Sequence, residues 1–367
     1  MRAAPMKASP EAGPTAVDLL AGQALAAHAR LRQTDPEGWM HAWRALPARP
    51  VAYSASMIDY MHAYLAGAGG WTLGDASLVL TNDGKPCGLW PLTFGGKDQS
   101  RLTSQGEPIL PPLFTADASP RTAKKIISEC LDALEQTASL GRGAMLCAEP
   151  PRPGLAGEGL SEFYRQAFRR GAETVAVRHD MYVDLKPNMD EIRSGWRKSY
   201  RPLVTSGLRT WSVHLVDAQN ASAETWETFR QLHCHVAGRE TRPRETWDLQ
   251  WRMILDGEAL LVWLADAGER MVGGGFFQFT DSEALYSVAA YDRDLFDKPL
   301  GHVVQARATE EFKRRGISWY KLGELKFAGD HDKPNAKELS IGAFKQGFAS
   351  HLFAKIVYEQ KSSGSAE

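Results

Sequence analysis

One stretch, residues 285–323, constrains the fold of this chain more than any other. It begins with a β-type run, Leu285–Tyr291, and passes through the loop Asp292–Pro299 into a helix. The apolar side chains of this helix recur at every fourth position, which gives the helix one face for a hydrophobic core. They are Leu300, Val304, Ala308 and Phe312.

The end of this helix is marked by Gly316, which suits a left-handed C-terminal cap, and by the basic run Lys313–Arg315. A second β-type run, Ile317–Leu322, follows at once. A helix that starts near the end of a strand presents unpaired backbone N–H groups there. The unit therefore predicts a site for a phosphate or a developing oxyanion.

The composition sets broad limits on the class of protein. A chain of 367 residues is long for one hydrophobic core, so two domains are expected. The net charge of −1 gives no overall basic field, and DNA is not an expected partner. Four cysteines without C-x-x-C spacing favour reduced core residues. The sequence shows neither an apolar run of membrane-spanning length nor a secretory signal, and we expect the cytoplasm.

The two halves of the chain share a pattern. SLVLTNDGKPCGLWPLTF, residues 77–94, reads as a β-hairpin, and ALLVWLADAGERMVGGGFFQF, residues 259–279, repeats it. A helix follows each hairpin, so the sequence indicates a duplicated α/β unit. The predicted divisions are a flexible tail (1–34), an N-terminal domain (35–187), a C-terminal domain (188–358) and a second tail (359–367).

A basic helix is predicted from Asn188, which suits an N-cap, to Pro202, which bends or ends it. Within it Arg193, Arg197 and Arg201 recur every four residues and form one stripe. Arginine suits forked contacts with phosphate. A solvated helix face is the alternative interpretation, and the two weigh about equally.

Four segments of the second half carry a resemblance to a known family. They are the basic helix around WRKSYR (196–201), LHCHVAGR (232–239), the three-strand meander that ends at Tyr291, and KELSIGAFKQGF (337–348). Together they resemble the FemAB-like branch of the GNAT acyltransferase superfamily, most clearly over residues 190–355. The resemblance implies an α/β (α+β) fold of two tandem GNAT-like domains, each a mixed central sheet flanked by helices.

The resemblance also implies an activity, the transfer of an activated acyl group to an amine. Acyl-CoA or aminoacyl-tRNA would be the co-substrate, with no tightly bound cofactor. The implied acceptor is an envelope polysaccharide, a peptidoglycan precursor or a small amino sugar. A catalytically idle double domain that binds nucleic acid, such as tRNA, or a protein partner is the alternative.

The loop before the central helix bears on the donor. Simple acetyl-CoA enzymes of the superfamily carry a Gln/Arg-x-x-Gly-x-Gly/Ala loop that cradles the pyrophosphate. The corresponding residues here, Asp297–His302, contain one glycine, so acetyl-CoA and aminoacyl-tRNA both stay open. The candidate donor-binding residues are Lys298, Gly301, His302, Arg197, Arg201 and, in a charged loop, Arg239.

The candidate catalytic residues lie near strand ends and in the last motif. Lys345 matches the lysine of the family's F-K-x-G-F element, where it would stabilise negative charge; a snorkelling surface lysine is the alternative. Glu324 is the first candidate for the general base and Asp292 the second, with Tyr291 beside it. Either carboxylate could equally cap a loop.

Two further motifs have competing interpretations. Gly273–Gly275 suits either a β-bulge that supplies a backbone donor or close helix–strand packing. His233 and His235 lie two residues apart on a predicted helix, so they face different sides and do not form one metal site. No metal is expected.

Overall fold

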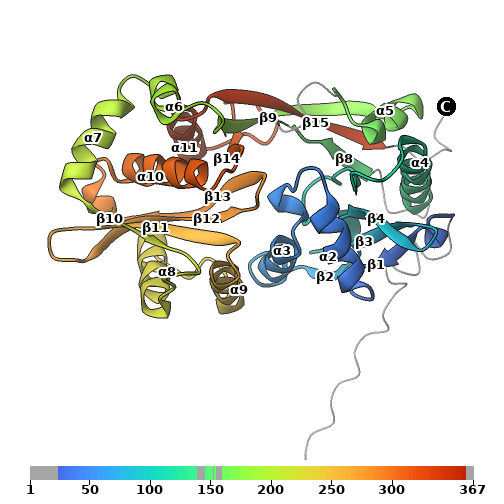
Figure 1. The fold of residues 1–367 in the computed structure, drawn as a ribbon, viewed down its shortest axis with the longest axis horizontal. Coiled ribbons are helices and arrows are strands. Elements are labelled where there is room, and N and C mark those ends of the chain that lie inside the picture. Colours follow the sequence, from blue (N-terminus) through green and yellow to red (C-terminus); the bar gives the residue numbers. More distant parts are fainter. Residues whose placement is uncertain (1–23, 139–144, 152, 154–158, 361–367) are drawn as a thin grey trace, which may run out of the picture.

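The computed structural model describes residues 24–138, 145–151, 153 and 159–360. One large sheet runs through both halves of the chain, and two small sheets complete the first half (Figure 1). The strand orders are β10-β11-β12-β13-β14-β9-β15-β8, β1-β3-β4-β7 and β2-β5-β6. Helices cover both faces of the large sheet, as expected for an α/β protein.

The first half alternates short strands with capped helices. Its helices are η1 (Ala24–Ala27), α2 (Pro36–Ala45), η2 (Val51–Tyr53), α3 (Ala55–Gly67), α4 (Pro120–Thr137) and α5 (Glu162–Arg169). Its strands are β1 (Ala29–Leu31), β2 (Thr72–Asp75), β3 (Leu78–Asn82), β4 (Lys85–Trp90), β5 (Thr93–Gly96), β6 (Arg101–Thr103), β7 (Leu113–Phe114), β8 (Met145–Glu149) and β9 (Glu173–Asp184). The side chains that cap α2 to α5 at their N-termini are Asp35, Ser54, Ser119 and Ser161.

The second half contains the predicted strand–loop–helix–strand unit. Its helices are α6 (Met189–Gly195), α7 (Tyr200–Thr210), α8 (Ala223–Ala237), α9 (Arg244–Leu255), η5 (Arg293–Leu295), α10 (Leu300–Arg314) and α11 (Ala336–Gln346). Its strands are β10 (Ser212–Val216), β11 (Ala259–Ala265), β12 (Met271–Phe279), β13 (Glu283–Tyr291), β14 (Trp319–Leu325) and β15 (His351–Gln360). The prediction for Gly316 is confirmed, because it follows α10 with φ +77.

The duplicated unit is visible in the order of the elements. Both predicted hairpins are confirmed, as β3–β4 and β11–β12. The succession α4, β8, α5, β9 in the first half then matches α10, β14, α11, β15 in the second. The last strand of each half lies beside a strand of the other half, because β9 pairs with β14 and β15 pairs with β8. A division at Pro187 stays a prediction, since this sheet is continuous across it.

The predicted tails are too long at both ends. Among residues 24–34, β1 pairs antiparallel with β3, and Leu25 is 1% exposed in the core of the first half. Burial of this leucine favours an ordered N-terminal segment that composition alone does not indicate. At the other end β15 continues to Gln360, which is 1% exposed. Residues 1–23 and 361–367 lie outside the described residues.

The prediction of one continuous basic helix is also wrong. The capping box at Asn188 is confirmed, but α6 ends at Gly195 and α7 begins at Tyr200. Trp196 takes an extended conformation between the helices and packs its buried ring against Phe348, with centroids 5.3 Å apart. Pro202 lies in the first turn of α7, where its missing N–H costs no hydrogen bond. The arginines therefore lie on two helices and the link between them.

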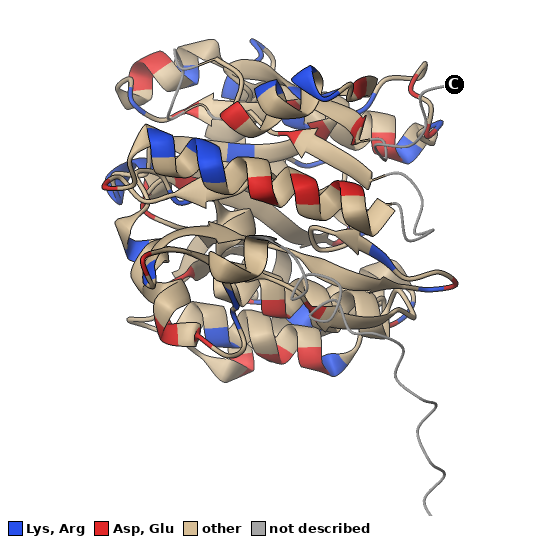
Figure 2. Cartoon of the chain, turned by 90° about the vertical axis from the view of Figure 1, so that its right-hand side faces the viewer, with Lys and Arg blue, Asp and Glu red and all other residues tan. Residues whose placement is uncertain are grey.

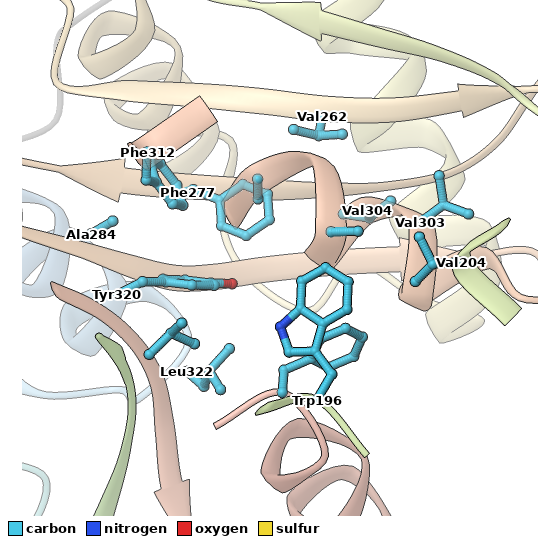
Figure 3. Close-up of a cluster of buried hydrophobic side chains, with 14 of the residues drawn as sticks. Trp196, Val204, Val262, Phe277, Ala284, Val303, Val304, Phe312, Tyr320 and Leu322 are labelled. Atoms are coloured by element: carbon cyan, nitrogen blue, oxygen red, sulfur yellow. The ribbon is translucent and has the colours of Figure 1, made fainter. Parts of the chain in front are cut away.

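The two faces of the large sheet carry separate cores. Helices α7, α10 and α11 lie on one face, and α8 and α9 lie on the other (Figure 1). Side chains from β12, β14 and α10 interlock under α10, among them Phe277, Phe312 and Tyr320 (Figure 3). On the other face, Phe229 of α8 and Trp247 of α9 belong to a second core. Each fully buried side chain of this size contributes roughly 1.5–3 kcal/mol.

The surface of the first half mixes charges of both signs. Figure 2 shows acidic and basic residues interleaved over the described part of the face that it presents. Helix α4 is basic in its first turns and acidic in its later ones. This face offers no single-sign stripe for a polyanion among the residues that the structure describes.

Candidate functional site

Strands β13 and β14 separate from each other in the middle of the large sheet. They pair in parallel only at their beginnings, where residues 283–285 face residues 319–321. Just beyond, each strand contains one extra residue relative to its antiparallel neighbour, Ser287 in β13 and Leu322 in β14. These two bulges bend the strands apart and open a split in the sheet under α10.

The bulge at Ser287 also decides where two tyrosines point. Residues five apart on a regular strand lie on opposite faces. Tyr286 and Tyr291 nevertheless both lie in the core beneath α10, whereas Val288 lies in the core on the other face. The hydroxyls of Tyr286 and Tyr291 are 3.1 Å apart as a result.

The glycine run of β12 is not the source of this distortion. Residues 273–275 pair in regular register with residues 289–291, and the shift comes after them. A Cβ atom at Gly275 would lie 2.9 Å from Cγ1 of Val304, and one at Gly273 would lie 2.6 Å from Cδ1 of Tyr291. Close packing is therefore the reason for glycine here. Register shifts flank the run, at Val272 against β11 and at Ser287 of β13, and none lies within it.

Tyrosine hydroxyls line the inside of the split. The Tyr320 hydroxyl donates to Oε1 of the fully buried Gln305 at 2.6 Å. Burial raises the pKa of Tyr286 to about 12 and raises the pKa values of Tyr291 and Tyr320 well above the ordinary value. All three side chains are therefore protonated at neutral pH and can donate hydrogen bonds.

Lys345 brings a positive charge to this place. It comes from the last turn of α11, and its Nζ lies 5.1 Å from the centroid of the Tyr286 ring. Gly323 makes room for it, because a Cβ atom there would lie 3.1 Å from Nζ. Burial lowers the pKa of Lys345 to about 8, and no carboxylate among the described residues pairs with it. Such a cation can receive an anionic or polarised oxygen of a ligand.

The start of α10 borders the same place. A Cβ atom at Gly301 would lie 3.0 Å from Cζ of Phe344 and 3.6 Å from Cζ of Tyr291. Pro299, the N-cap residue, makes no side-chain hydrogen bond to the helix. His302 packs edge-on against Tyr200, and burial lowers its pKa to about 4, so it is neutral. Lys298 lies nearby over the ring of Trp211, 5.6 Å from its centroid.

Arg197 donates hydrogen bonds to carbonyl groups at the C-terminal end of α11. Its Nη2 donates to the carbonyl of Ala343 at 3.0 Å, and its backbone N–H donates to Gly347 at 2.7 Å. Its Nη1 donates to the Tyr200 hydroxyl at 3.0 Å, which in turn donates to the carbonyl of Phe344 at 3.2 Å. These contacts cap the helix that carries Lys345.

The remaining predicted arginines do not converge with it. Arg193 pairs with Glu310, with 2.5 Å between Nη2 and Oε1, whereas Arg201 is exposed on α7. Arg239 is exposed just after α8, on the opposite face of the large sheet (Figure 1). The structure thus places Gly301, His302 and Arg197 against α11, Lys298 over Trp211 at the end of α7, and Arg239 elsewhere.

The two candidate bases lie apart from Lys345. Glu324 is in register with Asp180, on the face opposite α11, and accepts a hydrogen bond from Lys355 at 2.9 Å. Asp292 caps η5 by accepting from the N–H of Asp294 and also pairs with Arg270 at 2.9 Å. Asp292 therefore acts as a cap, which is the alternative role that the sequence predicts for it. The role of either carboxylate as a base stays a prediction.

Gln305 and Gly323 were not among the residues expected in the site. The position of Gln305 in the helical pattern does not predict a buried polar contact. Only the fold brings its side chain to Tyr320. Gly323 had a detectable signal, since an isolated glycine inside a strand pattern indicates a bulge or a close approach. Within the part of the chain that the structure describes, no cluster of three or more His, Cys, Asp or Glu side chains could hold a metal ion. No described helix is both long and apolar enough to cross a membrane.

Comparison with known proteins gives matches in fold but not in sequence. No family model matches the chain, and no curated protein matches its sequence. The crystal structure of FemX superposes with a TM-score of 0.61 at 14% identity, over 90% of this chain and 96% of FemX. L-PGS from Bacillus licheniformis gives a TM-score of 0.55 at 14% identity, over 90% of this chain and 93% of its own.

A third similar structure is the C-terminal domain of a putative lysylphosphatidylglycerol synthetase from Agrobacterium fabrum. Its TM-score is 0.52 at 11% identity, and the match covers 90% of this chain and 94% of that domain. The chain therefore shares the overall fold of these three structures, as the predicted resemblance to the FemAB-like branch implies, and the predicted α/β fold class is confirmed. Identities this low establish the fold alone.

Proposed function

We propose that this chain is a GNAT-fold N-acyltransferase that moves an activated acyl group onto an amine. The observation that carries the proposal is Lys345, a half-buried cation at the split between β13 and β14 that pairs with no carboxylate of the described residues. Attack on an acyl carbonyl places negative charge on its oxygen. A cation held in a partly water-excluded site stabilises that charge more strongly than one in water.

The chemistry follows in two steps. The amine nitrogen bonds to the acyl carbon, and the carbonyl electron pair moves to the oxygen, which the Lys345 ammonium stabilises. The tetrahedral intermediate then collapses, and the bond to the leaving sulfur of CoA or the leaving ribose oxygen of tRNA breaks. A base must accept the proton of the amine. Glu324 is the proposed base, and because it faces away from α11 it would serve an amine that enters from the opposite side of the sheet. One hydroxyl of the hydrogen-bonded pair Tyr286 and Tyr291 can donate its proton to the departing atom, while the other donates within the pair.

The donor would place its phosphates at the start of α10. The helix begins without a side-chain cap, so its first N–H groups can meet an anion. Lys298 and Gly301 would contribute a cation and a close backbone approach. Both acyl-CoA and aminoacyl-tRNA carry such phosphates. The acceptor would be an amine on a cytoplasmic precursor of the cell envelope.

The alternative is a double domain that binds nucleic acid or a partner without catalysis. Its binding surface would be the basic stripe, and the internal contacts of two of the three arginines weaken this alternative. Arg193 and Arg197 make internal contacts, and of the three only the exposed Arg201 has a side chain without a partner among the described residues. Strong binding of tRNA without consumption of any donor would favour this alternative.

The test is donor turnover at one fixed salt concentration, because phosphate contacts make affinity strongly salt-dependent. The purified chain is incubated with acetyl-CoA, or with a pool of charged tRNA, together with amine acceptors such as glucosamine and a lysine-containing peptide. Mass spectrometry detects the amide product. We expect one donor to lose its acyl group only when an amine is present. Failure of both donors with every amine would contradict the proposal.

A further inference from the structure

A second feature lies on the face of the large sheet opposite α10. A cavity of about 470 Å³ separates α3 of the first half from the segment after α8 and from β13 of the second half. Its walls combine thioether, aromatic and polar side chains. Those that matter for its chemistry are Met57, Tyr60, Met61, His233, Arg242 and Ser287.

Arg242 lines this cavity and is buried with part of its hydrogen-bonding capacity unused. Only 7% of the residue is exposed, and the guanidinium stacks on Trp247, 3.8 Å from the ring centroid. Its Nη1 donates to the Tyr60 hydroxyl at 2.6 Å. Its Nε and Nη2 are both buried, and neither finds an acceptor within the described chain. Buried donors of this kind are normally satisfied.

The charge of Arg242 also lacks a counter-ion. The groups that favour the charge are the hydroxyls of Tyr60 and Tyr64 and the thiol of Cys234, and burial lowers the pKa of the guanidinium. No described carboxylate forms a salt bridge with it. A buried charge without a partner destabilises a fold, and such cost is commonly tolerated at binding sites.

The two free donors define the shape of a partner. Nε and Nη2 lie along one edge of the planar guanidinium, and together they match the two oxygens of a carboxylate. His233 lines the same cavity, and its buried Nδ1 finds no partner within the described chain either. Met57 and Met61 provide an apolar wall for the remainder of a ligand.

We propose that this cavity binds an organic carboxylate, with both oxygens on the Nε and Nη2 edge of Arg242 and the apolar part of the ligand against α3. The site joins the two halves, because Tyr60 and the methionines come from the first half and Arg242 comes from the second. A ligand seated there contacts both.

The cavity also touches the split that contains Lys345. Ser287 and Tyr286, the residues at the bulge in β13, line the cavity, and the Tyr286 ring also lies under the Lys345 ammonium. The bound carboxylate would thus belong to the acceptor, which would be an amine that also carries a carboxylate and that approaches from the face opposite α10. This last step rests on the proposed acyl transfer, whereas carboxylate binding does not.

The test follows ligand-induced stabilisation of the whole chain. A ligand that binds only the folded state raises the free energy of unfolding as its concentration grows. Thermal unfolding is measured in butyrate, in inorganic phosphate and in chloride at matched ionic strength. The variants are Arg242→Met, Arg242→Lys and the control Arg239→Met, which removes an exposed arginine from the same loop.

We expect butyrate to stabilise the unchanged chain and Arg239→Met alike, and we expect no butyrate effect on Arg242→Met. Arg242→Lys keeps the charge but loses the paired donors, so its apparent affinity should fall at least about tenfold. This variant decides the matter if Arg242→Met does not fold. Lys345→Met should respond as the unchanged chain does, which separates this inference from failure of acyl transfer. Equal stabilisation of Arg242→Met, no butyrate effect on the unchanged chain, or a response to phosphate alone would overturn it.

Discussion

The ammonium of Lys345 lies 5.1 Å from the centroid of the Tyr286 ring, at the point where β13 leaves β14. Two bulges and one glycine produce this arrangement. Ser287 turns the Tyr286 side chain under α10, Leu322 moves β14 aside, and Gly323 leaves room for the lysine side chain. The fold thus places a positive charge where the sheet is open.

The charge of Lys345 should make the stability of the protein depend on pH. Burial lowers its pKa to about 8, whereas an unfolded lysine titrates near 10.4. Between these values the unfolded chain binds the proton more tightly than the folded chain, so the free energy of unfolding rises with pH. Each unit of pKa difference corresponds to about 1.4 kcal/mol.

Urea unfolding near pH 7 and near pH 10 measures this dependence, with Lys345→Met as the reference that lacks the group. The unchanged protein should gain stability relative to the variant as the pH rises. A difference between the two proteins that stays constant over this range would show that the lysine is not desolvated.

Arg197 should contribute to the stability of the fold rather than to the binding of donor phosphates. Replacement by alanine removes the hydrogen bonds to Ala343 and Tyr200 at the end of α11, which should cost roughly 1–2 kcal/mol. Arg201→Ala, on an exposed side chain of α7, should stay within about 0.5 kcal/mol. Chemical denaturation distinguishes the two variants.

The salt dependence of donor binding gives the complementary measurement. A residue that contacts phosphate contributes about one unit to the slope of log affinity against log salt. Because the guanidinium of Arg197 is engaged with α11, we expect Arg197→Ala to keep the slope of the unchanged protein. A slope reduced by one unit would instead assign Arg197 to the donor site.

Gly323→Ala should disturb both the backbone and the site. Gly323 has φ +123, which an alanine adopts only with strain, roughly 1–3 kcal/mol. The new Cβ would lie 3.1 Å from Nζ of Lys345 and would displace the ammonium. Acyl transfer should therefore fall beyond the loss of stability. Gly329→Ala, where a Cβ meets no atom within 4 Å, is the matched control. Equal transfer rates in the two variants would rule out this role of Gly323.

Glu324 and Asp292 should differ in function, the first in catalysis and the second in stability. If Glu324 accepts the amine proton, Glu324→Gln should lower the turnover number about 10²-fold or more and alter the pH profile. Asp292→Asn should mainly weaken the cap of η5 and the pair with Arg270, so it should lower stability and leave turnover nearly unchanged. Turnover of the purified variants at several pH values checks both expectations, and the reverse order would exchange the two roles.

Local features of the fold could be predicted from the sequence. The strand–loop–helix–strand unit, its cap at Gly316 and the capping box at Asn188 depend on neighbouring residues, and each was found as expected. The pairing of β9 with β14 and of β15 with β8 could not be predicted, because it joins segments far apart in the chain. Such pairing is decided by the global packing of the sheet.

The wrong predictions at the site also result from long-range packing. The periodic arginines suggested one helix, but burial of Trp196 broke it, since tertiary packing outweighs a helical pattern. A shift of one residue in a strand turns every following side chain to the other face. The bulge at Leu322 therefore decides which side Glu324 faces, and no local pattern reveals it.

The most direct test is the rate of acyl transfer by Lys345→Met. Lys337→Met, an exposed lysine on the same helix, is the control. The measurement uses the donor and amine that the unchanged protein accepts, in a single turnover, with circular dichroism to verify the fold. We predict a loss of roughly 10²–10³-fold for Lys345→Met, the usual effect of removing one group that stabilises an oxyanion, and no loss for the control. A folded Lys345→Met variant with the full rate would contradict the account.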